Sequence, residues 1–430
     1  MSAKATASVG YGTLLRHNPN YRNIWLGEIV SLFGDWFNLI ASAALVAKLT
    51  GSGVAVGGLF VVRMLAPFFI SPLAGVWADR YNRRWLLIAS DLARFVIVMG
   101  FLLVRRPEEV WLLYTLTVLQ LALSGVFFPA RNAILPDITK PGELGAANAL
   151  SSTTWSVMLS IGAALGGLVT GEWGIYPAFV VDAVSFLVSA IFIYRVTYTP
   201  PARAASKGGV RAVFEQYAEG LGFLRRNVDL LMITLLKTTA GLVISGGFQV
   251  LQVVITERIF VIGEGGATGL GLTYAVVGIG TGIGPIAARY FTGDRVWPLR
   301  VAIAVGFVSA AVGLLIMAPL ASFEWVLFGS LLRGVGAGLI WVFSTQLLLQ
   351  LTPAKVRGRV FSSDFAGQTL ANAVGAAVVG WAVDGTRLGL TGLLVALGVA
   401  TLLAAAGWTA WIMLGVKRAA PAEQGQSGGG

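Results

Sequence analysis

Long apolar runs, separated by short polar breaks, recur along the whole chain. A helix needs about 20 mostly apolar residues to cross the hydrocarbon core of a bilayer. Windows of this length predict twelve spanning helices, over residues 23–48, 54–78, 85–104, 110–130, 148–170, 174–194, 228–256, 269–288, 299–319, 324–349, 361–383 and 388–415. Strands of a membrane barrel alternate and are roughly 10 residues long, so the runs do not fit a barrel.

The composition excludes a soluble protein. Hydrophobic residues make up 56% of the 430 residues and charged residues only 12%, whereas a soluble domain is about 25% charged. A core could not hide this much apolar sequence, because much of a soluble protein of this length still faces water. The net charge of +11 would suit nucleic acid, but basic residues of membrane proteins collect in cytoplasmic loops. We therefore expect the lipid bilayer, and no nucleic acid, as the surroundings of this chain.

The lysines and arginines are divided unequally between the two sides of the predicted membrane protein. If both termini lie on one side, that side holds 22 of the 31 basic residues, and the opposite side holds only Lys48, Arg105, Arg106, Arg258 and Arg387. Such a bias places the basic side in the cytoplasm. We expect a multi-pass protein of a prokaryotic inner membrane with both termini in the cytoplasm.

The longest hydrophilic break, residues 195–227, follows the sixth predicted span. Between residues 210 and 226 its apolar residues recur at helical spacing, which predicts an amphipathic helix on the inner membrane surface. The predicted organisation is a six-helix bundle over 1–194, a cytoplasmic linker over 195–227 and a second bundle over 228–415. The Gly-rich tail, 416–430, cannot build a core and is expected to be disordered.

The two predicted bundles are related by an internal repeat. A shift of 213 residues aligns them without gaps across five spans, placing Gly34 on Gly247 and Gln120 on Arg333. The same shift superimposes the glycine pair of span five on that of span eleven, namely Gly162 and Gly167 on Gly375 and Gly380. Repeats of this kind are common in secondary transporters. These glycines are expected to allow close helix packing.

The loop after the second span carries a longer motif. It reads Gly75-Val-Trp-Ala-Asp79-Arg80-Tyr-Asn82-Arg83-Arg84, which resembles the signature Gly-x-x-x-Asp-Arg-x-Gly-Arg-Arg/Lys of the major facilitator superfamily. Asn82 replaces the usual glycine, and asparagine also tolerates a left-handed backbone. The resemblance covers nearly the whole chain. It implies an all-α membrane protein whose twelve helices form two pseudo-symmetric six-helix bundles.

Four further segments are similar to those of proton-coupled drug and siderophore exporters, the macrolide-efflux and enterobactin-exporter branch of that superfamily. They are Gly34-Asp35, Asp91-Leu-Ala-Arg94, Phe128-Pro-Ala-Arg-Asn-Ala133 and Gly162-Ala-Ala-Leu-Gly-Gly167. The last is similar to the antiporter motif Gly-Pro-x-x-Gly-Gly, with alanine in place of proline. Gln120 stands where many drug exporters carry a buried arginine. The resemblance implies a proton antiporter that exports amphipathic small molecules, as in multidrug efflux, by alternating access.

Carboxyl groups inside the spans are functional candidates by default, because they are costly to place there. Asp35 lies about 20 Å along the first span from Arg22, near the middle of the bilayer. Glu28 lies two turns earlier on the same face, and Asp182 lies at mid-depth in span six. Burial favours the neutral form of a carboxyl group, so each could load and release a proton. The alternative is a permanent hydrogen bond to a neighbouring helix.

The signature loop is a candidate gate. In the family it resembles, the aspartate at the position of Asp79 contacts the start of span eleven and locks the inner gate. A carboxylate is favoured at a helix N-terminus. Asp364 lies near the same end of span eleven, so its negative charge would repel that of Asp79 unless Arg80 or Arg359 lies between them. Ordinary anchoring on the inner side accounts for the other two arginines of the loop, Arg83 and Arg84.

Other charged residues inside the spans have two interpretations each. Asp91 and Arg94 are spaced i, i+3 and could form a buried ion pair near the inner gate, either permanently or only during part of the transport cycle. Arg63 and Lys237 could pair with the buried acids or attract an anionic cargo, and Arg333 could bind an anionic group or reach loop carbonyls. Candidates for the wall of a central cavity are Phe33, Trp36, Phe37, Arg131, Lys237, Phe248, Arg333 and Trp341.

Three other classes of protein fit less well. An ATP-driven pump needs a phosphate-binding loop, and no Gly-Lys-Ser/Thr occurs. A membrane enzyme lacks its usual chemistry here, since the chain has no cysteine and a single histidine, His17. A receptor or channel does not explain a two-fold repeat with mid-membrane acids. We expect no metal site and no cofactor. We expect the protein to be a monomer. Within the transporter class, a siderophore or lysophospholipid carrier and a uniporter without proton coupling stay open.

Overall fold

The computed structural model describes residues 10–140, 142–199, 210–353 and 356–419, and within these ranges it leaves out the side chains of 71–76, 78–80, 210–214, 216–217 and 415–419. The described part contains helices and no strand. Twelve of its helical segments are long and apolar enough to cross a membrane. The prediction of an all-α membrane protein with twelve spanning helices is therefore confirmed.

The helices before the linker form what we call the N-terminal half. It contains α1 (Tyr11–His17), α2 (Pro19–Thr50), α3 (Gly53–Arg80), α4 (Arg83–Gly100), η1 (Phe101–Leu103), η2 (Pro107–Glu109), α5 (Val110–Ile138), α6 (Leu144–Glu172) and α7 (Ile175–Tyr194). The largest difference from the predicted spans is in α5, which continues eight residues past 130 although Pro129 and Pro136 lie inside it.

The helices after the linker helix α8 (Val210–Arg226) form the C-terminal half. It contains α9 (Val228–Ala240), the π-helical turn η3 (Gly241–Gly246), α10 (Gly247–Arg258), η4 (Glu264–Gly266), α11 (Ala267–Thr292), α12 (Val296–Met317), α13 (Phe323–Leu351), α14 (Arg357–Gly385) and α15 (Gly389–Ala419). Because α15 is helical to Ala419, the tail predicted to be disordered is helical over its first four residues; residues 420–430 lie outside the described part.

Local signals in the sequence explain where the first spans begin and end. The side chain of Asn18 accepts a hydrogen bond from Tyr21 N at 2.9 Å, and Pro19 fills the first position of α2, where no amide donor is needed. Gly51, with φ +56°, ends α2 in a left-handed conformation. Ser52 follows at once and caps α3 by accepting from Ala55 N at 3.3 Å. The turn between two spans is therefore only two residues long.

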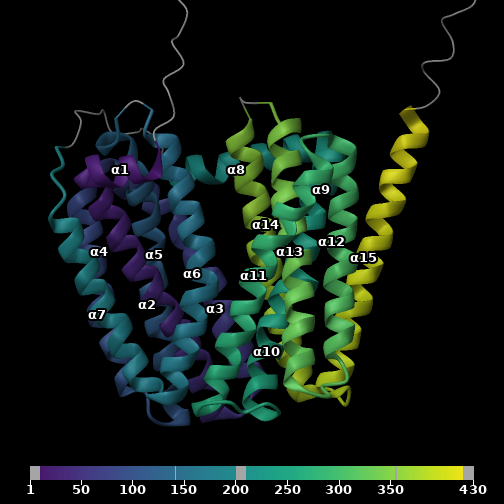
Figure 1. The fold of residues 1–430 in the computed structure, drawn as a ribbon, viewed down its shortest axis with the longest axis horizontal. Helices are drawn as coiled ribbons and strands as arrows, with labels where there is room; N and C mark the ends of the chain where they lie inside the picture. Colours follow the sequence, from purple (N-terminus) through teal and green to yellow (C-terminus); the bar gives the residue numbers. More distant parts are fainter. Residues whose placement is uncertain (1–9, 141, 200–209, 354–355, 420–430) are drawn as a thin grey trace, which may run out of the picture.

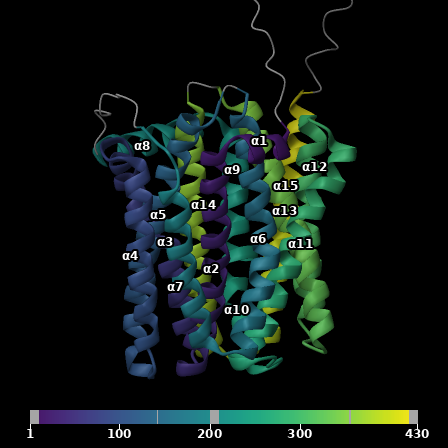
Figure 2. The ribbon, with the colours of Figure 1, turned by 60° about the vertical axis from the view of Figure 1, so that its left-hand side comes forward.

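The two halves lie side by side with their helices along a common direction, as Figures 1 and 2 show. The helix α1, the linker helix α8 and the end of α15 lie at one end of the molecule, at the top of Figure 1. We call this end the termini side and the other end the far side. The halves approach each other more closely at the far side than at the termini side, where α8 runs between them (Figure 1).

Two helix pairs join the halves: α3 packs along α14, and α6 packs along α11. Glycines bring the backbones together in both pairs. A Cβ atom on Gly167 would lie 2.6 Å from the Cα of Gly271, and one on Gly57 would lie 2.7 Å from the carbonyl oxygen of Ala376. Gly167 of α6 and Gly380 of α14 are related by the 213-residue repeat. The contact of α6 with α11 and the contact of α14 with α3 are therefore pseudo-symmetric counterparts. Close packing through small residues is the usual way helices associate in membranes.

The linker helix α8 spans the same residues, 210–226, that were predicted to be helical. It packs on the first turns of α14, where Gly220 leaves no room for a side chain against the carbonyl oxygen of Arg359. Arg359 also pairs with Glu219 at 2.8 Å, and Leu224 is buried in the core of the C-terminal half. The linker helix α8 is therefore held on the C-terminal half.

Candidate functional site

Charged and polar side chains from five helices meet inside the N-terminal half. This N-terminal charge cluster consists of Asp35 (α2), Arg63 (α3), Asp91 and Arg94 (α4), Gln120 (α5) and Asp182 (α7). Of the three carboxyl candidates for proton binding, it contains Asp35 and Asp182 but not Glu28. The spacing along α4 predicted the pair of Asp91 and Arg94, but the sequence did not indicate that this pair would meet the other four residues.

Arg94 is held rigidly on one side of the cluster. It pairs with Asp91 one turn away, and both side chains are buried. The guanidinium lies 4.5 Å from the ring centroid of Phe127 and 4.3 Å from that of Phe186, and it donates to Ser124 Oγ at 3.3 Å. Cation–π contacts of this kind strengthen when water is excluded. This surrounding fits a static ion pair better than one that breaks during transport.

Asp182 lies on the other side of the cluster, against the backbone of α2. A Cβ atom on Gly34 would lie only 2.6 Å from Asp182 Oδ1, so the glycine of the Gly34-Asp35 motif makes room for the carboxyl group. Gln120 Nε2 donates to Asp182 Oδ2 at 3.4 Å, while Oδ1 has no hydrogen-bond partner in the described part of the chain. Coulomb interaction links Asp182 to Asp35. Two carboxyl groups of neighbouring helices therefore share one site.

Arg63 connects this site to the boundary between the halves. Its charge interacts with Asp35 and Asp182 of the N-terminal half, and it lies near the neutral phenol of Tyr274 on α11 of the C-terminal half. One of its terminal nitrogens is buried without a hydrogen-bond partner among the described residues. Next to Arg63's partners, Trp36 packs edge-on against Tyr274 with ring centroids 5.7 Å apart. The cluster therefore lies next to a contact between the halves, that of Trp36 with Tyr274.

Glu28 lies apart from the cluster, nearer the termini side. It forms a buried ion pair with Arg131 of α5, and Ser151 of α6 hydrogen-bonds to Arg131. Arg131 was predicted as a residue of the cavity wall; the structure places it in this ion pair, and it is not among the residues that line the cavity described below.

The C-terminal half carries one buried arginine, Arg333, among its described membrane residues. Its Nη1 donates to the carbonyl oxygen of Ile244 at 3.1 Å, and its guanidinium lies 4.0 Å from the ring centroid of Phe248. Ile244 belongs to the π-helical turn η3, in which the wider winding disturbs the regular i→i−4 ladder. Of the two interpretations of Arg333, the structure therefore shows the carbonyl contact, although the carbonyl belongs to a helix and not to a loop.

A cavity of about 570 Å³ lies between the halves. Its wall includes Ser152, Trp155 and Ser156 of α6 and Lys237, Trp341 and Gln368 of α9, α13 and α14. Lys237 lies nine residues, about 14 Å, from the start of α9 on the termini side. Only two predicted wall residues, Lys237 and Trp341, line it; Phe33, Trp36, Phe37 and Phe248 pack elsewhere in or against the core.

Lys237 and Asp364 form the buried ion pair of the C-terminal half. Lys237 Nζ lies 2.5 Å from Asp364 Oδ2 and 3.4 Å from Thr345 Oγ1, and 4.5 Å from the ring centroid of Trp341. The sequence placed Asp364 opposite Asp79 in the gate and gave Lys237 no defined partner. The structure joins the two because α9 and α14 are neighbours, which no periodicity along one helix reveals.

The signature loop turns tightly between α3 and α4. The side chains of Asp79 and Arg80 lie outside the described residues, so the gate contact predicted for Asp79 stays a prediction. Asn82 adopts an extended backbone, φ −62° and ψ 115°, and caps α4 by accepting from Arg84 N; the left-handed conformation is not used.

The two arginines after Asn82 do more than anchor the loop at the membrane surface. Arg83 is buried and pairs with Asp137 of α5 at 2.6 Å, a partner that sequence reasoning missed. Arg84 donates to the carbonyl oxygen of Tyr194 at the end of α7. Both arginines therefore tie the start of α4 to neighbouring helices of the N-terminal half.

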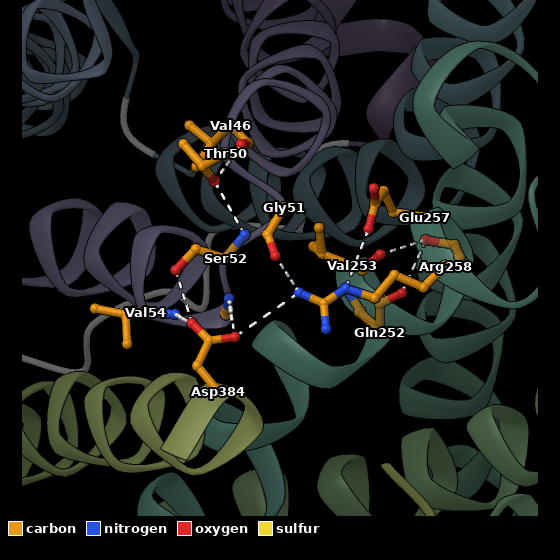
Figure 3. A network of polar contacts seen from close by, with 12 residues as sticks. Val46, Thr50, Gly51, Ser52, Val54, Gln252, Val253, Glu257, Arg258 and Asp384 are labelled. Carbon is orange, nitrogen blue, oxygen red and sulfur yellow. Dashed lines mark hydrogen bonds and ion pairs between the residues drawn. The ribbon is translucent and has the colours of Figure 1, made fainter. Parts of the chain in front are cut away.

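A second polar network joins the halves at the far side (Figure 3). Asp384 at the end of α14 accepts from Ser52 Oγ, Gly53 N and Val54 N at 2.7 to 2.9 Å, and so caps the first turn of α3. Arg258 of α10 reaches between Asp384, at 3.8 Å, and the carbonyl oxygen of Gly51. We call Arg258 and Asp384 the far-side latch; sequence reasoning did not single out Asp384.

The comparisons with known proteins agree with this architecture. The family model of the Major Facilitator Superfamily matches residues 24–376, and the chain belongs to this superfamily. It is a transporter and not an enzyme. A solved structure of a peptide transporter POT in complex with sulfate has a TM-score of 0.72 at 14% identity, covering 96% of this chain and 99% of that one; this likeness concerns the fold alone.

Relatives of similar sequence include named exporters. The chain is 26% identical over 415 residues to the uncharacterized MFS-type transporter YfiS of Bacillus subtilis (strain 168), with 91% of this chain and 94% of that one covered. It is 26% identical to multidrug resistance protein MdtG of Proteus mirabilis (strain HI4320), covering 74% and 76%. It is 21% identical to macrolide efflux protein A of Streptococcus pyogenes, covering 51% and 54%. The predicted resemblance to this superfamily and its exporters is confirmed.

Proposed function

We propose that this transporter exports amphipathic small molecules in exchange for protons. It lies in the inner membrane with both termini in the cytoplasm, so the termini side is the cytoplasmic side and the far side faces out. The observation that carries the proposal is the N-terminal charge cluster, which holds three carboxyl groups and two guanidinium groups.

The charges of the cluster do not balance when all groups are ionised. Arg94 is committed to Asp91, which leaves Asp35 and Asp182 to share Arg63. A net charge of −1 in a medium of low dielectric is costly, and one proton shared by Asp35 and Asp182 removes it. Glu28 already has its own counter-ion, Arg131, so we place the exchangeable proton on the Asp35 and Asp182 pair. Asp91 and Arg94 then form the fixed part of the site.

Proton binding is coupled to movement through the contact between the halves. Arg63 interacts with Asp35 and Asp182 within its own half and lies near Tyr274 across the boundary. When the carboxyl pair takes up a proton, Arg63 loses part of its attraction to the N-terminal half. Residues 1–194 and 228–415 rock against each other, residues 195–227 link them, and the far-side latch and the Asp79 loop close the two ends in turn.

The cargo class rests on the cavity and on the relatives. The cavity wall combines two tryptophans, Trp155 and Trp341, with hydroxyl and amide groups, a mixture that suits a ligand with an apolar body and a few polar groups. One relative is named for multidrug resistance and another for macrolide efflux. We extend these names to this chain as a proposal, and with it a monomer as the transporting unit.

Transport by the purified protein in proteoliposomes tests the proposal. A pH gradient imposed across the vesicle membrane should drive movement of amphipathic dyes and drugs. Movement of these molecules should in turn move protons, which a pH indicator trapped inside the vesicles records. Asp35→Asn and Asp182→Asn should each lower gradient-driven flux about tenfold or more. The matched control is Asp294→Asn, an exposed carboxyl group that pairs with Arg289 at the termini side.

Two results would contradict the proposal. If Asp35→Asn responds to the gradient as well as the parent, the proton does not bind there. If a lysophospholipid or a siderophore causes proton movement and no drug does, the cargo is a different one. Flux that does not depend on the pH gradient identifies a uniporter.

A further inference from the structure

The wall of the cavity has an unusual charge distribution. Among the described residues that line it, Lys237 is the single charged one. Its partner Asp364 lies behind it and is not part of the wall. The single charged residue of the wall is therefore a lysine that is 3% exposed, and the ion pair as a whole is neutral.

Lys237 also has unused binding capacity. An ammonium group carries three N–H donors, and two of them have partners in Asp364 Oδ2 and Thr345 Oγ1. The second contact is long, at 3.4 Å. The ring of Trp341 lies 4.5 Å from Nζ, and this cation–π contact takes the third N–H. The donor that makes only the long contact to Thr345 is the one available to a ligand.

The opposite wall supplies matching groups from the other half. Trp155 is 55% exposed and stands on the cavity wall with the hydroxyl groups of Ser152 and Ser156. An apolar ligand body can pack between Trp155 of the N-terminal half and Trp341 of the C-terminal half, while its polar end reaches Lys237. A ligand with a positive group at that end would instead meet the ammonium at close range, which is unfavourable where little water screens the charges.

We infer that the cargo is an amphipathic molecule with one acidic group, a carboxylate, sulfonate or phosphate, which binds Lys237 in competition with Asp364. This rests on the proposed function, because it names the charge of the cargo that the same cavity takes. It also gives Asp364 a role: it keeps Lys237 neutralised and in place while the cavity is empty.

A pair of dyes that differ by one acidic group tests the inference. 1-Anilinonaphthalene-8-sulfonate carries a sulfonate, and N-phenyl-1-naphthylamine has the same rings without it. Energy transfer from tryptophan to each dye, measured with the full chain in lipid nanodiscs and corrected with empty nanodiscs, gives the affinity of the protein for each. The parent should prefer the sulfonate dye about tenfold, as expected for one charge-assisted contact.

Variants of the two ion-pair partners should have opposite effects. Lys237→Gln should lower the affinity for the sulfonate dye about tenfold relative to the affinity for the neutral dye, and so abolish the preference. Asp364→Asn should raise the affinity for the sulfonate dye several-fold, because it frees the ammonium. Lys237→Arg keeps the charge and should retain the preference. A pair with a purely structural role would instead lower the affinity for both dyes in both variants.

The outcomes separate this inference from the proposed function. Equal affinity of the parent for both dyes, or an unchanged preference in Lys237→Gln, overturns the inference. If the neutral dye is transported in response to a pH gradient and the sulfonate dye is not, the acidic cargo is wrong while proton-coupled export stands. If neither dye nor any other amphipathic molecule moves in the gradient, the proposed function itself fails.

Discussion

The two halves share one architecture but differ sharply in what they bury. At the positions related by the 213-residue repeat, Asp35, Arg63, Asp91, Arg94 and Asp182 of the N-terminal half correspond to Phe248, Val276, Ala304, Phe307 and Val395 of the C-terminal half. Phe248 and Phe307 are buried, so apolar side chains fill these places without loss of the helix arrangement. The helix arrangement of the C-terminal half therefore needs no charges at these positions, and their presence in the N-terminal half points to function.

The most severe test of this difference removes one buried arginine from each half, Arg94 from the N-terminal half and Arg333 from the C-terminal half. Arg94→Met leaves Asp91 without its counter-ion, and breaking a buried ion pair typically costs about 3–5 kcal/mol. Arg333→Met should cost only about 1–2 kcal/mol. The substitution removes one hydrogen bond to a carbonyl oxygen and one cation–π contact, and it leaves no buried carboxylate without a counter-ion. Thermal unfolding in detergent measures both.

A double variant sharpens this prediction. Asp91→Leu combined with Arg94→Met replaces the ion pair by side chains like those of the C-terminal half, and most of the lost stability should return. If the double variant is as unstable as Arg94→Met alone, the N-terminal half depends on its charges for folding and the comparison of the halves fails.

Where the halves behave alike, at the glycine contacts, symmetric variants should act alike. Gly167→Ala and Gly380→Ala, at positions related by the repeat, each place a methyl group within about 3 Å of the facing backbone, and such overpacking costs about 1–3 kcal/mol. Each should shift the population away from the conformation closed at the far side. The matched control is Gly282→Ala on α11, which has open space around it.

The absence of native cysteine makes this shift measurable. A single cysteine introduced at Ser52, at the far side, is the only thiol in the chain, and its labelling rate reports opening. Both glycine-to-alanine variants at the contacts between the halves should be labelled faster than the parent and the Gly282→Ala control. Equal rates in all four proteins would show that the glycine contacts do not hold the far side closed.

Gln120→Arg gives the N-terminal half the arginine that its counterpart, Arg333, supplies in the other half. The cluster would then hold three acids and three bases and would need no proton for neutrality. Gradient-driven flux should fall about tenfold, equivalent to roughly 1.4 kcal/mol, while exchange of cargo without a pH gradient continues. Gln120→Leu is the control without charge. Unchanged proton dependence in Gln120→Arg would show that charge balance does not control coupling.

The smallest effect is expected at the far-side latch. Arg258→Gln removes a half-exposed ion pair with Asp384 at 3.8 Å, and such pairs contribute about 0–1 kcal/mol. Labelling of the cysteine at position 52 should rise no more than about fivefold. Asp384→Asn should act more strongly, because Asp384 also caps α3. A reversed order of the two variants would mean that the ion pair, and not the cap, holds the far side closed.

Much of the fold could be predicted because its causes are local. The length and polarity of each segment are set by the bilayer, so twelve spans and the helix over 210–226 follow from the chain read in windows. Two differences are not explained by the windows: α5 continues through Pro129 and Pro136, and α15 extends four residues beyond the predicted end of the bundle.

The candidate site could be predicted only in part. Asp35, Asp91, Arg94 and Asp182 were found because charges inside spans are conspicuous. Their grouping around Gln120, the pairing of Lys237 with Asp364, and the partners Asp137 and Asp384 depend on which helices are neighbours. Phe33, Phe37 and Phe248 carry no signal that distinguishes a cavity wall from a core.

The sequence by itself determined the environment, the spans, the repeat and the family of this protein, because a hydrophobic solvent constrains every residue along the chain in the same way. Only the tertiary structure decided which charges of different helices meet. Each of the decisive contacts, from Gln120 with Asp182 to Arg258 with Asp384, joins helices far apart in sequence, and such contacts exist only once the helices have packed.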